Sequence, residues 1–114
     1  MESLFEKIKE YVKMDGEISA EEFLEYYTNV MEKLTADFDQ LTEEELFQAK
    51  TITSIMASNA AARGKRKDEN VKKFKKIKEK SNFWAGAVEY RLKKAGFSEA
   101  EIAERSAEME KDMK

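Results

Sequence analysis

Lysine and arginine side chains are concentrated in one segment of this 114-residue chain, residues 63–80, which holds ten basic and three acidic residues. Such a cluster neutralises phosphate groups and releases their counterions, which is the main source of sequence-independent affinity for nucleic acid. The segment is therefore predicted to contact nucleic acid or a nucleic-acid-bound complex, and the alternative is a solvated face. The candidate phosphate-binding residues are Arg63, Lys65, Arg66, Lys67, Lys72, Lys73, Lys75, Lys76 and Lys80.

Acidic residues dominate the other half of the chain. Residues 1–62 contain 14 acidic and five basic residues, and all 14 acids lie within residues 1–45. Rows of carboxylates on helices resemble a DNA phosphate track, as in phage-type inhibitors such as anti-CRISPR proteins. A second hypothesis is therefore a DNA mimic that inhibits a nucleic-acid enzyme, and a third is a self-assembling helical module, for example a homodimer. The candidate acidic face is Glu21, Glu22, Glu25 and Glu32.

Residues that commonly perform catalysis are missing. The chain has no histidine and no cysteine, which removes the commonest general base and all thiolate chemistry. The carboxylate pair Asp37 and Asp39 lacks the further inward-facing ligands that a di-metal site needs. The sequence therefore predicts a small regulatory or interaction protein that is not an enzyme, with no cofactor and no metal site.

One stretch, DGEISAEEF at residues 15–23, resembles the second half of an EF-hand calcium loop. With Gly16 at the sixth position, Glu22 takes the twelfth. However, Tyr11 and Lys13 occupy the first and third positions, where carboxylates are required. A glycine turn followed by a helix cap explains the same residues, so we predict a turn that binds no calcium.

Helices are expected to position all of these side chains. The chain has no proline and only four glycines, and its apolar residues recur at spacings of three and four. Three Ser/Thr-x-x-Glu patterns, which begin at Ser19, Thr42 and Ser98, predict helix starts, whereas Gly16, Gly64 and Gly96 predict left-handed helix stops. The predicted fold is an all-α bundle of about five helices, near 3–14, 20–35, 43–63, 69–95 and 99–112.

The length is that of a single domain, 1–114, made of the acidic half 1–62, the basic segment 63–80 and a C-terminal helical hairpin 82–112. A wide apolar arc predicts that helix 43–63 is central. If helix 69–95 is continuous, its basic end is expected to project beyond the bundle, and a break at Ser81 and Asn82 is the alternative.

The predicted core combines one stripe from each long helix. Phe83, Trp84 and Tyr90 are interpreted as core residues in preference to an exposed stacking platform. No apolar run approaches the roughly 20 residues needed to span a bilayer, so a cytoplasmic location without a membrane partner is expected. The predicted core residues are Leu4, Phe5, Ile8, Phe23, Tyr27, Val30, Leu46, Ile55, Phe74, Trp84, Val88 and Leu92.

Overall fold

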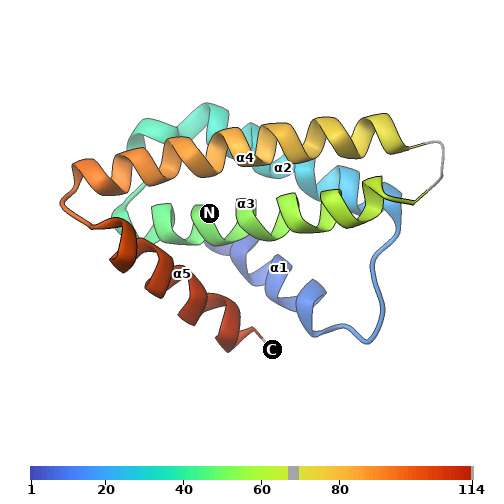
Figure 1. The fold of residues 1–114 in the computed structure, drawn as a ribbon, viewed down its shortest axis with the longest axis horizontal. Helices are drawn as coiled ribbons and strands as arrows, with labels where there is room; N and C mark the ends of the chain where they lie inside the picture. The colour runs from blue at the N-terminus through green and yellow to red at the C-terminus, as the bar shows by residue number, and fades with distance from the viewer. Residues whose placement is uncertain (67–69, 114) are drawn as a thin grey trace.

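A computed structural model describes residues 1–66 and 70–113, and within these ranges the helices are joined by short turns and there is no strand. This confirms the predicted all-α bundle. The helices are arranged as Figure 1 shows. Their bounds are Glu2–Lys13 (α1), Ala20–Asp37 (α2), the 3-10 helix Phe38–Gln40 (η1), Glu43–Gly64 (α3), Val71–Lys94 (α4) and Glu99–Asp112 (α5).

Helix α3 forms the centre of the bundle, as its wide apolar arc predicts. Half of its 22 residues are buried, from Leu46 near one end to Arg63 near the other. Helix α4 runs along one side of α3, while α1 and α5 lie along another (Figure 1). The small residues Ala49, Ala57 and Ala60 are buried on α3, which lets its neighbours approach closely.

Helix α4 is unbroken through Ser81 and Asn82. Its 24 residues span about 36 Å at 1.5 Å per residue, within the 43 Å long dimension of the molecule. It lies beside α3 over most of that length (Figure 1). Phe74 and Leu92, near the two ends of α4, are both buried, so neither end extends away from the bundle. The expectation of a projecting basic end was therefore wrong.

The three predicted helix caps are present. Ser19, Thr42 and Ser98 each accept a hydrogen bond from the backbone N–H three residues later, at 3.1–3.2 Å. At Thr42 and Ser98 the glutamate at that position also accepts from the cap's own N–H, which completes a capping box. At Ser19 the box is incomplete, and the Glu22 carboxylate instead accepts a hydrogen bond from the Tyr11 hydroxyl at 3.3 Å.

Only one of the three predicted glycine stops adopts the left-handed conformation in the described ranges. Gly96 has a φ of 105°, and the turn around it is closed by a 3.1 Å hydrogen bond from the Phe97 N–H to the Leu92 carbonyl. These contacts form a Schellman motif, which satisfies the last carbonyls of α4. The other two predictions were wrong, because α1 ends before Gly16 and Gly64 is still helical.

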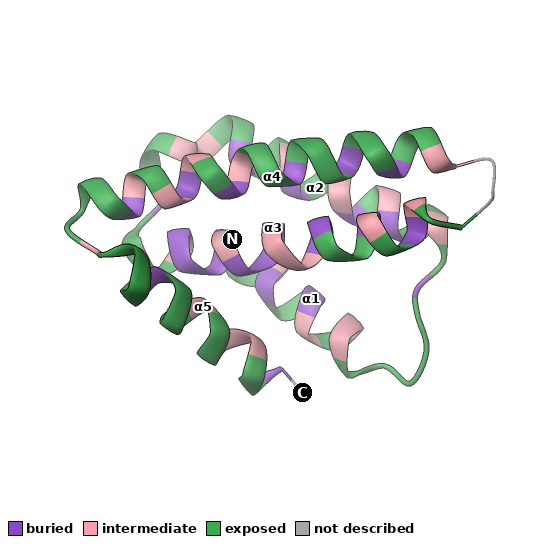
Figure 2. Cartoon of the chain, viewed as in Figure 1, coloured by how far each residue is buried: buried purple, intermediate pink, exposed green. Residues whose placement is uncertain are grey.

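The core matches most of the predicted stripes (Figure 2). Leu4, Tyr27, Ile55 and Trp84 are only partly buried and pack against the core. Tyr26 is buried in place of Tyr27, and its hydroxyl donates a 2.7 Å hydrogen bond to the Leu4 carbonyl. The predicted core residues that are buried are Phe5, Ile8, Phe23, Val30, Leu46, Phe74, Val88 and Leu92.

The capping boxes make the stability of the fold depend on pH. Hydrogen bonds from the cap residues lower the pKa of Glu45 and Glu101 below the ordinary value of 4.5. As the pH falls below 4.5, these two carboxylates are protonated in the unfolded chain before they are protonated in the folded chain. The stability that the ionised carboxylates contribute above their ordinary pKa is therefore lost as the pH falls.

We expect the free energy of unfolding to fall between about pH 5 and pH 3, and to fall less steeply in a Glu101→Gln variant, because the amide cannot be protonated there. Urea titrations at a series of pH values measure this. Glu104→Gln is the control, since Glu104 is exposed on the same helix and outside the capping box. Equal slopes for Glu101→Gln and the wild type would contradict the expectation.

Candidate functional site

Five exposed residues lie in line on the outer surface of α4. Lys72, Lys76, Phe83, Tyr90 and Lys94 are separated by four, seven, seven and four residues, so each step is about one or two helical turns. Phe83 is 67% exposed and Tyr90 is 60% exposed, which is unusual for residues of this size. We call these five residues the α4 strip.

The strip faces solvent because the opposite side of α4 is anchored in the core. Phe74 and Ile77 are buried, and the ring of Phe74 lies 6.0 Å from that of Phe23 on α2. Side chains half a turn away from these residues must therefore point outward.

More lysines surround the first turns of the strip. Lys73, Lys75 and Lys80 are exposed, as is Lys78, which is not among the predicted phosphate-binding residues. No salt bridge joins any lysine from Lys72 to Lys80 to another residue in the described ranges. This half of α4 thus presents a positively charged surface that forms no ion pair with the described part of the fold.

The second half of the strip is aromatic. The Phe83 ring packs against Trp84 in a T-shaped arrangement, with 5.6 Å between ring centroids, and the Lys94 ammonium lies 5.1 Å from the Tyr90 ring. Gly86 lies between the two exposed rings, and a Cβ built on it would meet no atom within 4 Å. The two rings therefore flank an open stretch of helix surface about 10 Å long.

This placement corrects the interpretation of the aromatic residues as core. Trp84 is partly buried and its ring lies 5.3 Å from that of Phe38 in η1, but Phe83 and Tyr90 are exposed. The sequence does contain the signal, because both exposed rings are in helical phase with Lys76 and out of phase with Phe74.

Arg63 does not join the basic surface, contrary to prediction. Its side chain is buried, with the guanidinium 4.8 Å from the Phe23 ring and 5.8 Å from the Phe74 ring. One terminal nitrogen, Nη2, donates a 2.7 Å hydrogen bond to the Ile18 carbonyl. Its position seven residues after the buried Met56 is the sequence signal for this burial.

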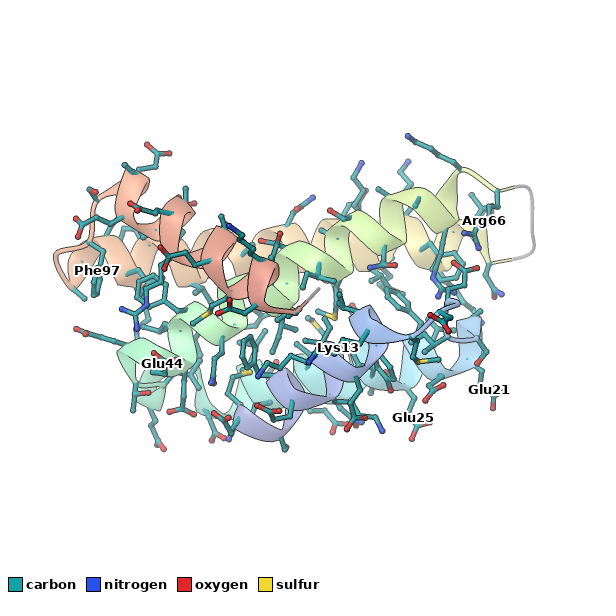
Figure 3. All side chains as sticks on the ribbon, turned by 90° about the horizontal axis from the view of Figure 1, so that it is seen from below. Lys13, Glu21, Glu25, Glu44, Arg66 and Phe97 are labelled. Carbon is teal, nitrogen blue, oxygen red and sulfur yellow. The ribbon has the colours of Figure 1, made fainter. Side chains whose placement is uncertain are left out.

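The other basic residues after α3 differ in their surroundings. Lys65 is exposed. Arg66 forms a two-pronged ion pair with Glu17, with 2.9 Å between Nη2 and Oε2, and its hydrogen bond lowers the pKa of the Glu17 carboxyl. Arg66 is therefore already engaged within the fold, at the end of the molecule seen on the right of Figure 3. Lys67 lies outside the described residues.

The predicted acidic face is on α2. Glu21, Glu25 and Glu32 are exposed and in helical phase, and no ion pair joins them to another described residue. Glu21 and Glu25 lie near the same end of the molecule as Arg66 (Figure 3). Glu22 is different, since it accepts the hydrogen bond of Tyr11; burial and this carboxylate together raise the pKa of the tyrosine hydroxyl.

The segment that resembles half of an EF-hand forms the turn between α1 and α2 up to Ser19, and its remaining residues begin α2. Tyr11 and Glu22, which occupy the first and last positions of the calcium pattern, are hydrogen-bonded to each other. In the described part of the chain, no group of three or more histidine, cysteine, aspartate or glutamate side chains is arranged to hold a metal ion. That the turn binds no calcium remains a prediction.

No protein-family model matches the chain, and no curated protein or solved structure is significantly similar to it. Among the described helices, none is both long and apolar enough to cross a membrane. The function must therefore be argued from the surface of α4 and its chemistry.

Proposed function

We propose that this protein is a non-enzymatic, cytoplasmic protein that binds single-stranded nucleic acid through the α4 strip. The observation that carries the proposal is the alignment of two exposed aromatic rings, Phe83 and Tyr90, with exposed lysines on one helix face. Lysines attract the phosphate backbone, and aromatic rings stack on bases, and this combination is typical of proteins that bind single strands.

A single strand fits this surface better than a duplex does. In a duplex the base faces are covered by their neighbours, so the rings of Phe83 and Tyr90 would find nothing to stack on. The strip from Lys72 to Lys94 is about 33 Å long, which is enough for several nucleotides. Because its charges are lysines, which act as flexible point charges, we expect little discrimination between base sequences.

The test is the affinity of a fluorescently labelled oligonucleotide, measured by anisotropy at about 0.05 M salt, where screening is weak. We expect the single strand to bind more tightly than the duplex of the same sequence. Replacing Phe83 and Tyr90 together by alanine should weaken single-strand binding by about 1.5 to 4 powers of ten, because two stacked bases are lost and each contributes about 1–3 kcal/mol. The salt dependence should stay the same, because the lysines remain.

Met14→Ala is the matched control for this double variant. Met14 is also a large exposed apolar residue, at 49%, but it follows α1 and is not part of α4. Its replacement should leave the affinity unchanged. If neither nucleic acid binds at low salt, or if the double alanine variant binds as tightly as the wild type, the proposal fails.

The acidic row on α2 supports a second candidate function. Glu21, Glu25 and Glu32 are exposed, in phase and without an ion-pair partner among the described residues, as a mimic of a phosphate track requires. Such a protein would bind the basic cleft of a nucleic-acid enzyme and inhibit it, and would not bind nucleic acid itself. Inhibition lost on reversing these three glutamates to lysine, with no oligonucleotide binding by the wild type, would favour this candidate.

A further inference from the structure

A cavity of about 330 Å³ lies between α1, the turn before α2, the first turns of α2, and α3, away from the α4 strip. Most of its lining is apolar, including Ile8, Val12 and Ile55. Arg63 also lines it, and this buried guanidinium is the feature that calls for an explanation.

The hydrogen bonds of Arg63 are incomplete. Its Nη2 donates to the Ile18 carbonyl, but its Nε is buried and has no acceptor among residues 1–66 and 70–113. No carboxylate among the described residues lies within ion-pair distance of it. The Phe23 and Phe74 rings give the cation a favourable electrostatic contact but accept no hydrogen bond in the plane of the guanidinium. A buried, partly unpaired cation is costly, so it is a strong recognition point for an anion.

Glu17 does not supply that anion. It lines the cavity, but its carboxylate is held by Arg66, and the hydrogen bond from Arg66 has the largest effect on its pKa while the charge of Arg63 has the smallest. Glu17 is half exposed, at the solvent side of the site. The positive charge of Arg63 is therefore left for a ligand.

We propose that this cavity binds a small organic carboxylate. The carboxylate accepts hydrogen bonds from the guanidinium of Arg63, and the apolar body of the ligand lies against Ile8, Val12 and Ile55. A volume of about 330 Å³ is at the small end of the range for ligand sites and about twice that of a cavity that holds benzene. A medium-length aliphatic chain or a fused ring system would therefore fill it.

Access to the cavity is through the turn between α1 and α2. Met14 and Gly16, both exposed, lie on its lining, and the Met14 side chain is an adaptable apolar group at the entrance. This site shares no residue with the α4 strip, so the inference stands or falls independently of nucleic-acid binding.

The test uses sodium octanoate and octanol, which share an eight-carbon chain and differ in charge. Amide chemical shifts of the isotope-labelled protein are followed during titration with each compound. We expect octanoate to shift the amides of Val12, Ile55 and Arg63 and to bind at least about tenfold more tightly than octanol, because only octanoate pairs with the guanidinium. Equal binding of the two compounds, shifts confined to the lysines of α4, or no binding would each overturn the proposal.

Variants test the two halves of the site separately. Arg63→Met should remove the preference for octanoate over octanol, but it also changes the core.

Ile55→Trp fills the cavity from a half-buried position and keeps Arg63. It should weaken the binding of octanoate at least tenfold. Glu17→Gln should strengthen octanoate severalfold, because it removes a like charge from the site. Unchanged octanoate binding in a folded Ile55→Trp variant would place the ligand elsewhere and overturn the proposal.

Discussion

Replacing Lys72, Lys76 and Lys80 together by glutamate is expected to abolish oligonucleotide binding at about 0.1 M salt. Each lysine that contacts a phosphate contributes about 0.7 to the logarithmic salt slope on a single strand, and each reversal also adds a repulsive charge. We expect a loss of at least three powers of ten in affinity. The fold should survive, because all three lysines are exposed and glutamate has about the same helix propensity as lysine.

The matched control is reversal of three exposed lysines elsewhere, Lys7, Lys13 and Lys111. This variant has the same net charge as the α4 variant, but its changes lie on α1 and α5. It should lose far less affinity, since repulsion by distant exposed charges is screened by salt. Equal losses in the two variants would mean that only net charge matters, and retained binding by the α4 variant would refute the proposed interface. Circular dichroism checks that both variants are helical.

The choice of Lys72, Lys76 and Lys80 for reversal depends on the structure. In the sequence alone, all the basic residues of segment 63–80 look equally suitable. Arg63 would be a poor choice, because it is buried between rings from α2 and α4 and its reversal would damage the core. Arg66 would be ambiguous, because its reversal also breaks the ion pair with Glu17. The exposed lysines of α4 are the residues whose replacement tests phosphate binding alone.

Most of the fold could be predicted from the sequence because its signals are local. A capping box such as that of Ser98 and Glu101 involves four consecutive residues, and the apolar stripes follow from helical periodicity. The left-handed stop at Gly96 was predicted correctly, but the sequence did not show that Gly16 and Gly64 lack this conformation, because glycine permits a positive φ without requiring it.

The candidate sites depended on contacts between distant parts of the chain. The burial of Arg63 needs Ile18 as a hydrogen-bond acceptor 45 residues away, which no local pattern reveals. The cavity beside it is likewise formed by residues of α1, α2, α3 and the turn between α1 and α2. The α4 strip is intermediate: the helical phase of Phe83 and Tyr90 can be read from the sequence, but the side of α4 that meets the core is set by its packing against α3.

Phe74→Ala and Phe83→Ala form a pair that tests this packing directly. The two residues lie on one helix and undergo the same substitution, but Phe74 is 1% exposed whereas Phe83 is 67% exposed. We expect Phe74→Ala to lower the free energy of unfolding by about 3–5 kcal/mol, through lost burial and the cavity left beside Phe23. We expect Phe83→Ala to change it by no more than about 0.5 kcal/mol.

Urea denaturation measures both values, and an unchanged m-value shows that each variant still unfolds as one unit. Domains of this size are stable by only about 5–15 kcal/mol, so the loss of stability in Phe74→Ala should be easily measured. If the wild type lies at the lower end of this range, Phe74→Ala should be partly unfolded at room temperature. If Phe83→Ala were as destabilising as Phe74→Ala, the ring of Phe83 would be buried in solution. It could not then stack on a base, and the α4 strip would lose the aromatic half on which its preference for single strands depends.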